Sequence, residues 1–318
     1  MSTDNHGGII FREVSKKRII ILGAGGFIGW WLLKRSLEGQ WDEVIGLSRE
    51  NLDLMSWESV SAVLSSLTME DVIILAAGIA RFRANHFEAM QKNLRMTEHI
   101  VEILKLHPVS QLIYLSSVDA YGCLERHVPS KERVLSEATP LHPDDYYGIG
   151  KIACEKMFQD HLTRLHIAVS ILRLPGVYGP SDQGRSTIGH FIQRITQEGR
   201  ITIYGDGSNT RDYLYIDDLY QAVAAVIRFR LNDCLNIVSG RSYSLLEIVR
   251  MITEQAGCRC DINWKPRMNT DTERIHLMQF DPAKRIRLLP GVQVHDLAWG
   301  IKEYLQNIQK TLPRFIPP

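Results

Sequence analysis

A tyrosine and a lysine in the segment YYGIGK, residues 146–151, are spaced so that they could handle a proton together. Of the eleven tyrosines, only Tyr147 has a lysine four residues later. On a helix, Lys151 would lie on the same face as Tyr147, one turn away. Its positive charge would lower the pKa of the phenol, which could then donate or accept a proton near neutral pH. The alternative is an exposed aromatic–cation pair.

Three glycines near the N-terminus have the spacing of a phosphate-binding turn. Gly23, Gly26 and Gly29, in GAGGFIG, follow the apolar run RIIIL and lead into a helical stretch that starts with Phe27 and Ile28. Glycine permits a tight turn and close approach of the backbone to a diphosphate, and the helix N-terminus supplies free N–H groups. The segment therefore predicts dinucleotide binding, although an ordinary glycine-rich turn could look the same.

Apolar runs alternate with helical stretches through the first half of the chain. Strands are predicted at Arg18–Leu22, Glu43–Leu47, Asp71–Ala77, Gln111–Leu115 and Ala168–Leu172. Helices are predicted at Phe27–Glu38, Trp57–Ser66, Phe87–Leu106 and Tyr146–Arg164. Such alternation is typical of crossover units around a parallel sheet. The expected fold class is α/β, a doubly wound parallel sheet of the Rossmann type.

After Leu172 the pattern changes, because turn signals become frequent and the predicted strands become short. This predicts a smaller α/β substrate-binding lobe at the C-terminal side of the sheet, with Leu235–Val238 returning to the sheet as a further strand. We expect residues 1–16 to be a flexible tail and residues 17–175 to form the dinucleotide-binding domain, with a return segment at about 216–242. Residues 176–215 and 243–318 would form the lobe.

Composition limits the classes of partner. The net charge of +1 gives no strong field, so we expect no nucleic-acid partner. The polar N-terminus lacks the apolar region of a secretory signal, and the longest apolar run, Ile19–Leu33, is too short to cross a bilayer. Five scattered cysteines indicate reduced thiols and a cytoplasmic protein. Cys258 and Cys260 are too close together for a usual zinc site, so no metal is predicted.

The glycine spacing G-x-x-G-x-x-G, with Tyr-x-x-x-Lys downstream, resembles the short-chain dehydrogenase/reductase family. RLPGVYGP at 173–180 and IYGDGSNTRDYLYIDD at 203–218 resemble its extended branch, the nucleotide-sugar epimerases, dehydratases and ketoreductases. The resemblance runs from Arg18 to about Gln309. It implies a nucleotide-sugar substrate whose diphosphate is held by Arg211, with Tyr204 beside the base and Thr187 at another contact position.

The same resemblance assigns further site positions. Ser117, in LSSVDAYG at 115–122, matches the hydroxyl residue that hydrogen-bonds the substrate carbonyl, with Ser116 as the fallback. The two acids that perform dehydration in related dehydratases fall at Val118 and Asp119, so dehydration is disfavoured. Asp119 is either an acid/base at the sugar or a solvated or capping carboxylate. Tyr147 and Lys151 would also contact the cofactor.

The end of the second predicted strand bears on the choice of cofactor. NAD-binding proteins usually place an acid there, whereas here Leu47 is followed by Ser48 and Arg49, which suit a 2′-phosphate. NADP is therefore favoured and NAD is the alternative. The family resemblance adds an adenine contact by Asp53, followed by Leu54, and small residues that leave room for the cofactor at Ala76, Ala77 and Gly78.

Together these features predict an NAD(P)-dependent oxidoreductase of a nucleotide-diphosphate sugar, most simply a 4-keto-sugar reductase. The alternatives are a 4-epimerase that retains NAD, and a non-catalytic dinucleotide-binding sensor or scaffold. Gly176 stands where many relatives have asparagine, which leaves a small ketone or aldehyde substrate open. The family is often dimeric, so we expect a homodimer through the helix that carries Tyr147. Candidate interface or core residues on that helix are Met157, Phe158 and Leu162.

Overall fold

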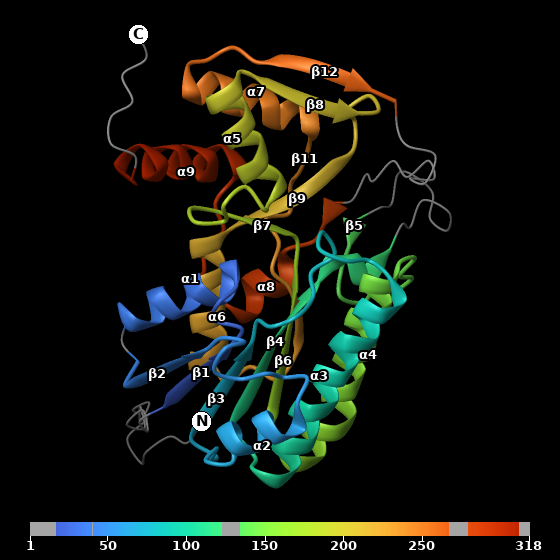
Figure 1. Ribbon diagram of the computed structural model, residues 1–318, viewed down its shortest axis with the longest axis vertical. Helices are drawn as coiled ribbons and strands as arrows, with labels where there is room; N and C mark the ends of the chain where they lie inside the picture. The colour runs from blue at the N-terminus through green and yellow to red at the C-terminus, as the bar shows by residue number, and fades with distance from the viewer. Residues whose placement is uncertain (1–16, 40, 123–133, 267–278, 312–318) are drawn as a thin grey trace, which may run out of the picture.

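The computed structural model describes residues 17–39, 41–122, 134–266 and 279–311. Its main element is a six-stranded sheet in the order β10-β6-β4-β3-β1-β2 (Figure 1), and all of its strand pairs are parallel. The strands are β1 (Arg18–Leu22), β2 (Glu43–Leu47), β3 (Asp71–Leu75), β4 (Gln111–Ser117), β6 (Ala168–Leu174) and β10 (Cys234–Asn236). The predicted doubly wound sheet is confirmed, and the predicted return strand joins its edge as β10.

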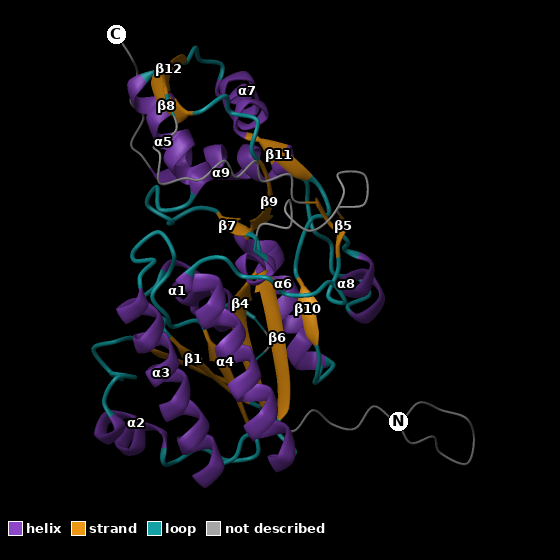
Figure 2. Ribbon diagram, turned by 90° about the vertical axis from the view of Figure 1, so that its right-hand side faces the viewer, coloured by secondary structure: helices purple, strands orange, loops and turns teal. Residues whose placement is uncertain are grey.

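Helices cover both faces of this sheet (Figure 2). Because side chains alternate along a strand, Ile19 and Ile21 of β1 belong to one apolar core, and Ile20 and Leu22 belong to the other. The first core includes residues of α1 (Phe27–Leu37) and α6 (Ile216–Arg228). The second includes residues of α2 (Trp57–Leu64), α3 (Phe87–Leu106) and α4 (Tyr146–Leu162). Because the sheet is covered on both faces, most residues of its strands are apolar and buried, although β4 and β6 also bury Gln111, Ser170 and Arg173.

A second group of elements lies beyond the carboxyl ends of the sheet strands (Figure 1). It holds a three-stranded sheet, β11-β9-β7, and the parallel pair β12-β8, with an apolar core that includes Ile192, Tyr213 and Ile248. The strands are β7 (Gly176–Tyr178), β8 (Arg200–Tyr204), β9 (Thr210–Tyr215), β11 (Ser242–Ser244) and β12 (Asp261–Lys265). The helices are α5 (Thr187–Glu198), α7 (Leu245–Ala256) and α9 (Leu297–Thr311).

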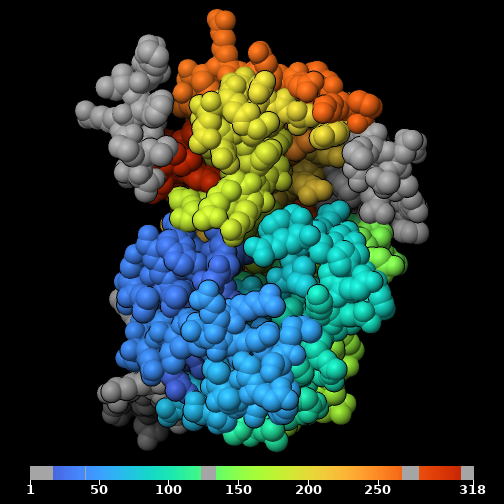
Figure 3. Space-filling model, in the orientation of Figure 1, coloured from blue at the N-terminus to red at the C-terminus, as the bar shows by residue number. Residues whose placement is uncertain are grey.

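Short elements connect the two parts. The 3₁₀ turn η1 (Val118–Tyr121) continues directly from β4, and η3 (Thr163–Leu165) follows α4. β5 (Val134–Leu135) pairs with β13 (Gln279–Phe280), which precedes α8 (Ala283–Leu288). The chain passes from the main sheet to the second group of elements, here called the upper part, at Pro175, between β6 and β7. We propose the predicted domain boundary there. The surface is hollowed where the two parts face each other (Figure 3).

Some details differ from the sequence prediction. β3 ends at Leu75 rather than Ala77, because Ala77 leaves the sheet to pack against Gly23. β4 is longer than predicted and ends at Ser117. Phe158 and Leu162 are fully buried in the core, so Met157 is the candidate interface residue that remains accessible.

Three further expectations concern the described residues alone. Cys154, Cys234, Cys258 and Cys260 are free thiols, while Cys123 lies outside the described residues. The described part of the chain contains no cluster of metal-ligating side chains. Across the same residues, no helix has the length and apolar character needed to cross a membrane.

Candidate active site

The glycine turn joins β1 to α1 beside the end of β3. Gly23 has a φ of +94°, and a Cβ on it would come within 2.6 Å of the Ala77 amide nitrogen. A Cβ on Gly29 would overlap the Gly23 carbonyl oxygen. Gly26 is the N-cap of α1 and is exposed, so the backbone at the helix start is open to a ligand. This close-packed turn fits a dinucleotide diphosphate, because side chains at Gly23 and Gly29 would force it apart.

The end of β2 lies directly against this turn. The Leu47 carbonyl accepts hydrogen bonds from the amides of Gly23 and Ala24 at 2.8 and 3.0 Å. Ser48 follows, and its hydroxyl donates to Asn51 at 3.0 Å, while Arg49 is exposed. Ser48 therefore borders the turn, and the exposed Arg49 follows it along the chain.

The other predicted cofactor positions differ in their exposure. Asp53 is half-buried, and its carboxylate accepts a hydrogen bond from the Met55 amide at 3.0 Å. The Leu54 side chain is buried in the apolar core that includes residues of α2, α3 and α4. After β3, Ala76 and Ala77 are half-buried and Gly78 is exposed, so the segment of small residues lines the turn without filling the space in front of it. Phe27 and Ile28 are half-buried against the first core.

Ser117, Tyr147 and Lys151 come together at the carboxyl end of β4. Ser117 is the last residue of β4, and its hydroxyl lies next to the phenol of Tyr147, in the first turn of α4. Lys151 lies one turn further, and its Nζ donates to the Leu115 carbonyl at 2.7 Å. The same Nζ lies 5.6 Å from the centre of the Tyr147 ring. The structure thus places the three predicted catalytic side chains in one cluster.

The two glycines of YYGIGK explain how α4 reaches this position. A Cβ on Gly148 would come within 2.6 Å of the Asp119 carbonyl oxygen, so glycine lets α4 lie directly against η1. A Cβ on Gly150 would come within 3.0 Å of the Met90 side chain on α3. Asp145 begins the helix by accepting a 2.7 Å hydrogen bond from the Gly148 amide. The segment is therefore a helix start fitted between two neighbours.

The predicted lowering of the Tyr147 pKa by Lys151 is wrong for the chain by itself. Burial raises the pKa of the Tyr147 phenol well above its usual range, and the negative charge of Asp119 raises it further. The neighbouring Ser117 hydroxyl and the charge of Arg81 lower that pKa, but burial outweighs them. Burial also lowers the pKa of Lys151 to about 8. Desolvation is the largest cause for both groups, which are half-buried at the strand end.

Asp119 is tied into ionic and hydrogen-bonding contacts. Its Oδ2 accepts a hydrogen bond from the Ser117 hydroxyl at 3.1 Å, and its Oδ1 lies 3.2 Å from Nη1 of Arg81. The Ser117 hydroxyl also accepts a hydrogen bond from the Asp119 amide at 3.1 Å. The Asp119 carboxylate is therefore charge-paired, while the capping side chain of η1 is that of Ser117.

A buried network that the sequence did not reveal lies behind this cluster. Glu155 on α4 and Arg173 on β6 form a bidentate pair at 2.7 and 3.1 Å. Ser116 donates to Glu155 at 2.5 Å, so its hydroxyl is committed there and does not support a catalytic role. Arg173 also donates to the Tyr121 hydroxyl at 3.0 Å. In the sequence, the four-residue spacing of Lys151 and Glu155 indicates that the two share one face of a helix. The partner of Glu155, Arg173 on β6, depends on which strand pairs with β4.

The predicted substrate residues lie in the upper part. Thr187 is the first residue of α5, Tyr204 is exposed at the end of β8, and Arg211 is exposed on β9. The alternative salt bridges of Arg211 are absent among the described residues. Asp212 accepts hydrogen bonds from the Ser239 and Gly240 amides, and Asp217 pairs with Arg35. The Arg211 guanidinium is therefore available to an anionic ligand.

Gly176 lies on β7 next to Tyr213. A Cβ there would come within 3.0 Å of the Tyr213 ring, so a larger residue would have to displace that ring. Where many relatives have asparagine at this position, the Tyr213 ring here occupies the space that a larger side chain would need.

Comparisons with known proteins agree with this geometry. Residues 19–237 match the family model described as "NAD dependent epimerase/dehydratase family". The chain is 26% identical to the uncharacterized UDP-glucose epimerase YtcB of Bacillus subtilis strain 168, covering 85% of this chain and 94% of that protein. It is 28% identical to GDP-L-fucose synthase of Sinorhizobium fredii, covering 92% and 96%.

Solved structures show the same fold. UDP-glucose 4-epimerase of Thermotoga maritima, solved with UDP-glucose, superposes with a TM-score of 0.81 at 22% identity, over 93% of this chain and 100% of that chain. RMD of Pseudomonas aeruginosa, solved with NADPH, gives a TM-score of 0.77 at 20% identity, over 93% and 99%. The Rossmann sheet with a second group of elements beyond its carboxyl ends is therefore an arrangement shared with these proteins.

Proposed function

The chain belongs to the NAD dependent epimerase/dehydratase family of NAD(P)-dependent, short-chain dehydrogenase/reductase-type enzymes, and we propose that it reduces the 4-keto group of a nucleotide-diphosphate sugar. The observation that carries this proposal is the cluster of Ser117, Tyr147 and Lys151 at the carboxyl end of β4, on the same edge of the sheet as the glycine turn that follows β1. Asp119 is held by Arg81 and Ser117, which does not favour the elimination chemistry of a dehydratase.

The residues of the cluster divide the work of reduction. When bound, the reduced nicotinamide supplies the hydride that forms the new C–H bond at the carbonyl carbon. Ser117 donates a hydrogen bond to the carbonyl oxygen, where negative charge develops. Tyr147 gives its phenolic proton to that oxygen, and its raised pKa keeps the phenol protonated beforehand. Lys151 is positioned one turn away to compensate the phenolate that remains.

We propose NADP as the preferred cofactor. Ser48 borders the turn at the end of β2, the exposed Arg49 follows it along the chain, and a guanidinium pairs well with a phosphate. Fluorescence titration with NADPH and NADH provides the test. We expect Arg49→Gln to weaken NADPH binding by about tenfold, the loss of one charge-assisted phosphate contact, and to leave NADH binding unchanged. Equal losses for both cofactors would contradict the assignment.

The nucleotide-sugar substrate is proposed to lie against the upper part of the molecule. Arg211 on β9 would hold the diphosphate, and Tyr204 and Thr187 would contact the rest of the nucleotide. Support comes from the unpaired, exposed state of Arg211 among the described residues, and from relatives named for GDP- and UDP-sugar substrates. A panel of UDP, GDP, CDP and dTDP in thermal-shift measurements would identify the nucleotide.

The second candidate is a nucleotide-sugar 4-epimerase, which is favoured by the relatives and solved structures named as such. Both reactions use the same three side chains, so cofactor behaviour separates them. A reductase consumes added NADPH in proportion to the 4-keto sugar supplied. An epimerase consumes none, and NAD would be found among the ligands released from the purified protein.

The experiment mixes the purified protein with NADPH and 4-keto nucleotide sugars and follows NADPH absorbance. We expect stoichiometric oxidation by the wild type and a loss of about 10²–10⁴-fold in kcat/KM for Tyr147→Phe. The neighbouring Tyr146→Phe is the matched control, because Tyr146 is exposed and packs on Phe87 instead. Turnover that survives Tyr147→Phe would refute the proposed chemistry.

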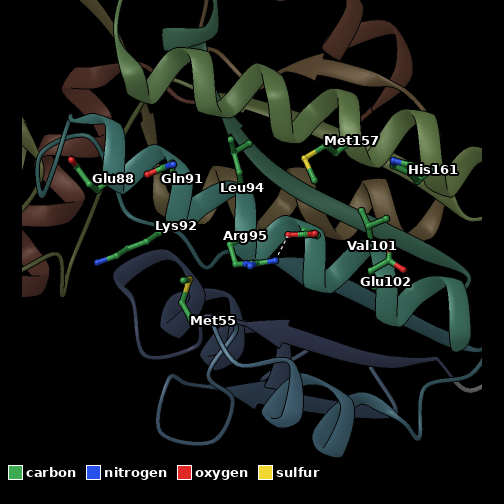
Figure 4. A pocket seen from close by; sticks show the side chains of 11 residues that line it. Met55, Glu88, Gln91, Lys92, Leu94, Arg95, Val101, Glu102, Met157 and His161 are labelled. Atoms are coloured by element: carbon green, nitrogen blue, oxygen red, sulfur yellow. Dashed lines mark hydrogen bonds and ion pairs between the residues drawn. The ribbon is translucent and has the colours of Figure 1, made fainter.

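We also propose a homodimer that forms through the outward faces of α3 and α4. Between these helices runs a groove with a volume of about 810 Å³ (Figure 4), whose apolar residues are Met55, Leu94, Val101 and Met157. Its charged residues include Glu88, Lys92, Arg95, Glu98 and Glu102. Both signs alternate along α3, so a second copy related by a two-fold axis can place opposite charges against each other. Light scattering should show a dimer that Met157→Arg dissociates and the exposed control Met69→Arg preserves.

We propose that the enzyme acts in the cytoplasm. The four described cysteines are all free, as expected in a reducing compartment. A fluorescent fusion observed in the source cells would test this, and export of the fusion would contradict it.

A further inference from the structure

Arg81 lies between two carboxylates that flank the catalytic tyrosine. Its Nη1 is 3.2 Å from Oδ1 of Asp119, and its Nε is 3.1 Å from Oδ2 of Asp145. Asp119 belongs to η1, Asp145 is the N-cap of α4, and Tyr147 lies two residues into the helix that Asp145 begins. One guanidinium therefore joins the two chain segments that meet at Tyr147.

The segment that carries Arg81 is anchored on both sides. The side chain of Asn93 on α3 makes two hydrogen bonds with the backbone of Ile79, at 2.8 and 3.1 Å. Asn85 accepts a hydrogen bond from the Tyr147 amide at 3.1 Å and donates to Asp145 at 3.2 Å. The connection from β3 to α3 thus holds the first turn of α4 and brings Arg81 to the edge of the site.

The ion pairs of Arg81 place a positive charge beside the two carboxylates, Asp119 and Asp145, that act on Tyr147. Burial raises the pKa of Tyr147 most, Asp119 and Asp145 raise it further, and Ser117 and Arg81 lower it. Lys151 and Tyr114 are the other titratable groups next to the phenol. The Lys151 Nζ donates to the Leu115 carbonyl and lies 4.7 Å from the Tyr114 ring centre, and among the described residues no ion pair joins it to either carboxylate.

We propose that Arg81 is a positioning residue of the reaction, which pairs with Asp119 and Asp145 so that neither carboxylate acts uncompensated on Tyr147 and the start of α4 stays fixed. The proposal rests on the role proposed above for Tyr147. It gives Arg81 a function different from direct binding of a substrate anion, since two of its three nitrogens already face carboxylates.

The ion pairs themselves contribute little to folding. The side chains of Arg81 and Asp119 are 33% and 30% exposed, and pairs at such positions are screened by water. We therefore expect Arg81→Gln to change the melting temperature by less than about 2 °C. A large effect on the reaction with a small effect on stability distinguishes positioning from a structural contact.

The first test is the pH dependence of kcat/KM for the substrate and cofactor identified above. In Arg81→Gln the positive charge of Arg81 is lost. The pH at which the profile of kcat/KM reports ionisation of the Tyr147 phenol should therefore rise by about one pH unit. Adding Asp119→Asn to that variant should move that pH back, and Arg81→Lys should stay near the wild type. Arg83→Gln is the control, because Arg83 is exposed on the same segment and has no ion pair among the described residues. Identical pH profiles, or a change in KM alone, would overturn the proposal.

A second test needs no substrate, so it separates failure of this inference from failure of the proposed function. Tyrosine labelled with ¹³C at Cζ gives one signal per ring, and Tyr147→Phe identifies the signal of interest. We expect that signal to move in Arg81→Gln, to move in the opposite direction in Asp119→Asn, and to stay in place in Arg83→Gln. An unmoved signal in Arg81→Gln would overturn the proposal even if the enzyme proves inactive on every nucleotide sugar.

Discussion

Two arginine–carboxylate clusters lie on either side of the end of β4, and they differ in burial more than in chemistry. In the first, Glu155 and Arg173 are 5% and 7% exposed and share two hydrogen bonds. In the second, Arg81 meets Asp119 and Asp145 through single contacts at about one third exposure for Arg81. A buried pair is costly to break, whereas an exposed pair contributes little to stability.

The comparison teaches that similar groups serve different purposes at one strand end. The buried cluster joins α4, β4 and β6, so it maintains the framework that holds Ser117 and Lys151 in place. Although burial alone would lower the pKa of Arg173, its hydrogen bonds and ionic contact with Glu155 raise that pKa above its usual range. The exposed cluster is free to adjust the charge at Tyr147. Variants that break one cluster and not the other can test this division.

The largest effect is expected at the buried pair. Glu155→Gln should lower the free energy of unfolding by about 3–5 kcal/mol, because it leaves the Arg173 guanidinium buried without a counter-charge. Urea denaturation measures the change. The double variant Glu155→Leu/Arg173→Met should recover much of the loss, since it removes both charges together. If the single variant cost as little as a surface change, the assigned difference between the clusters would be incorrect.

Two adjacent serines sharpen the comparison, because each belongs to one cluster. Ser117→Ala should lower kcat/KM by about 10²-fold through loss of a hydrogen bond to the reacting oxygen, with little effect on stability. Ser116→Ala should instead lower the free energy of unfolding by about 1.5–3 kcal/mol, the value of a hydrogen bond to a charged group. Steady-state kinetics and urea denaturation of both variants provide the measurement. An exchange of the two outcomes would reverse the assignment.

Lys151 should show a conflict between function and stability. Burial lowers the pKa of Lys151 from 10.5 to about 8. Below pH 8 the side chain is protonated in both the folded and the unfolded state, so folding carries the full cost of burying its charge. We expect Lys151→Met to inactivate the enzyme and yet raise the free energy of unfolding at pH 7 by about 2 kcal/mol. The gain should shrink between pH 8 and about 10.5, where the unfolded chain also loses the proton. A destabilised variant at pH 7 would contradict this account.

The smallest effect is expected at a solvent-exposed pair. Arg194 and Glu198 on α5 form an i,i+4 salt bridge with side chains that are 40% and 32% exposed. Arg194→Gln should change the free energy of unfolding by less than about 0.5 kcal/mol, because water and salt screen the contact. The same urea titration places this variant at the low end of the scale whose high end is Glu155→Gln.

The sequence determined what depends on local pattern. Largely apolar runs indicated the parallel strands of the main sheet, because strands covered on both faces are mostly apolar, and the run at Leu235–Val238 indicated β10. The spacing of Gly23, Gly26 and Gly29 after a strand specified the tight turn, since a Cβ at Gly23 or Gly29 would clash with backbone atoms. The interval between Tyr147 and Lys151 placed them on one helical face.

Tertiary structure alone decided the electrostatics of the site. The sequence predicted a lowered pKa for Tyr147 because it shows the nearby lysine, but the depth of burial and the position of Asp119 depend on how α4 packs against η1. The partners of Glu155 and Arg81 come from β6 and from the segments around Tyr147, far away along the chain. Spacing along the sequence reports neighbours within one helix, whereas charge and solvation depend on every group that the fold brings within a few ångströms.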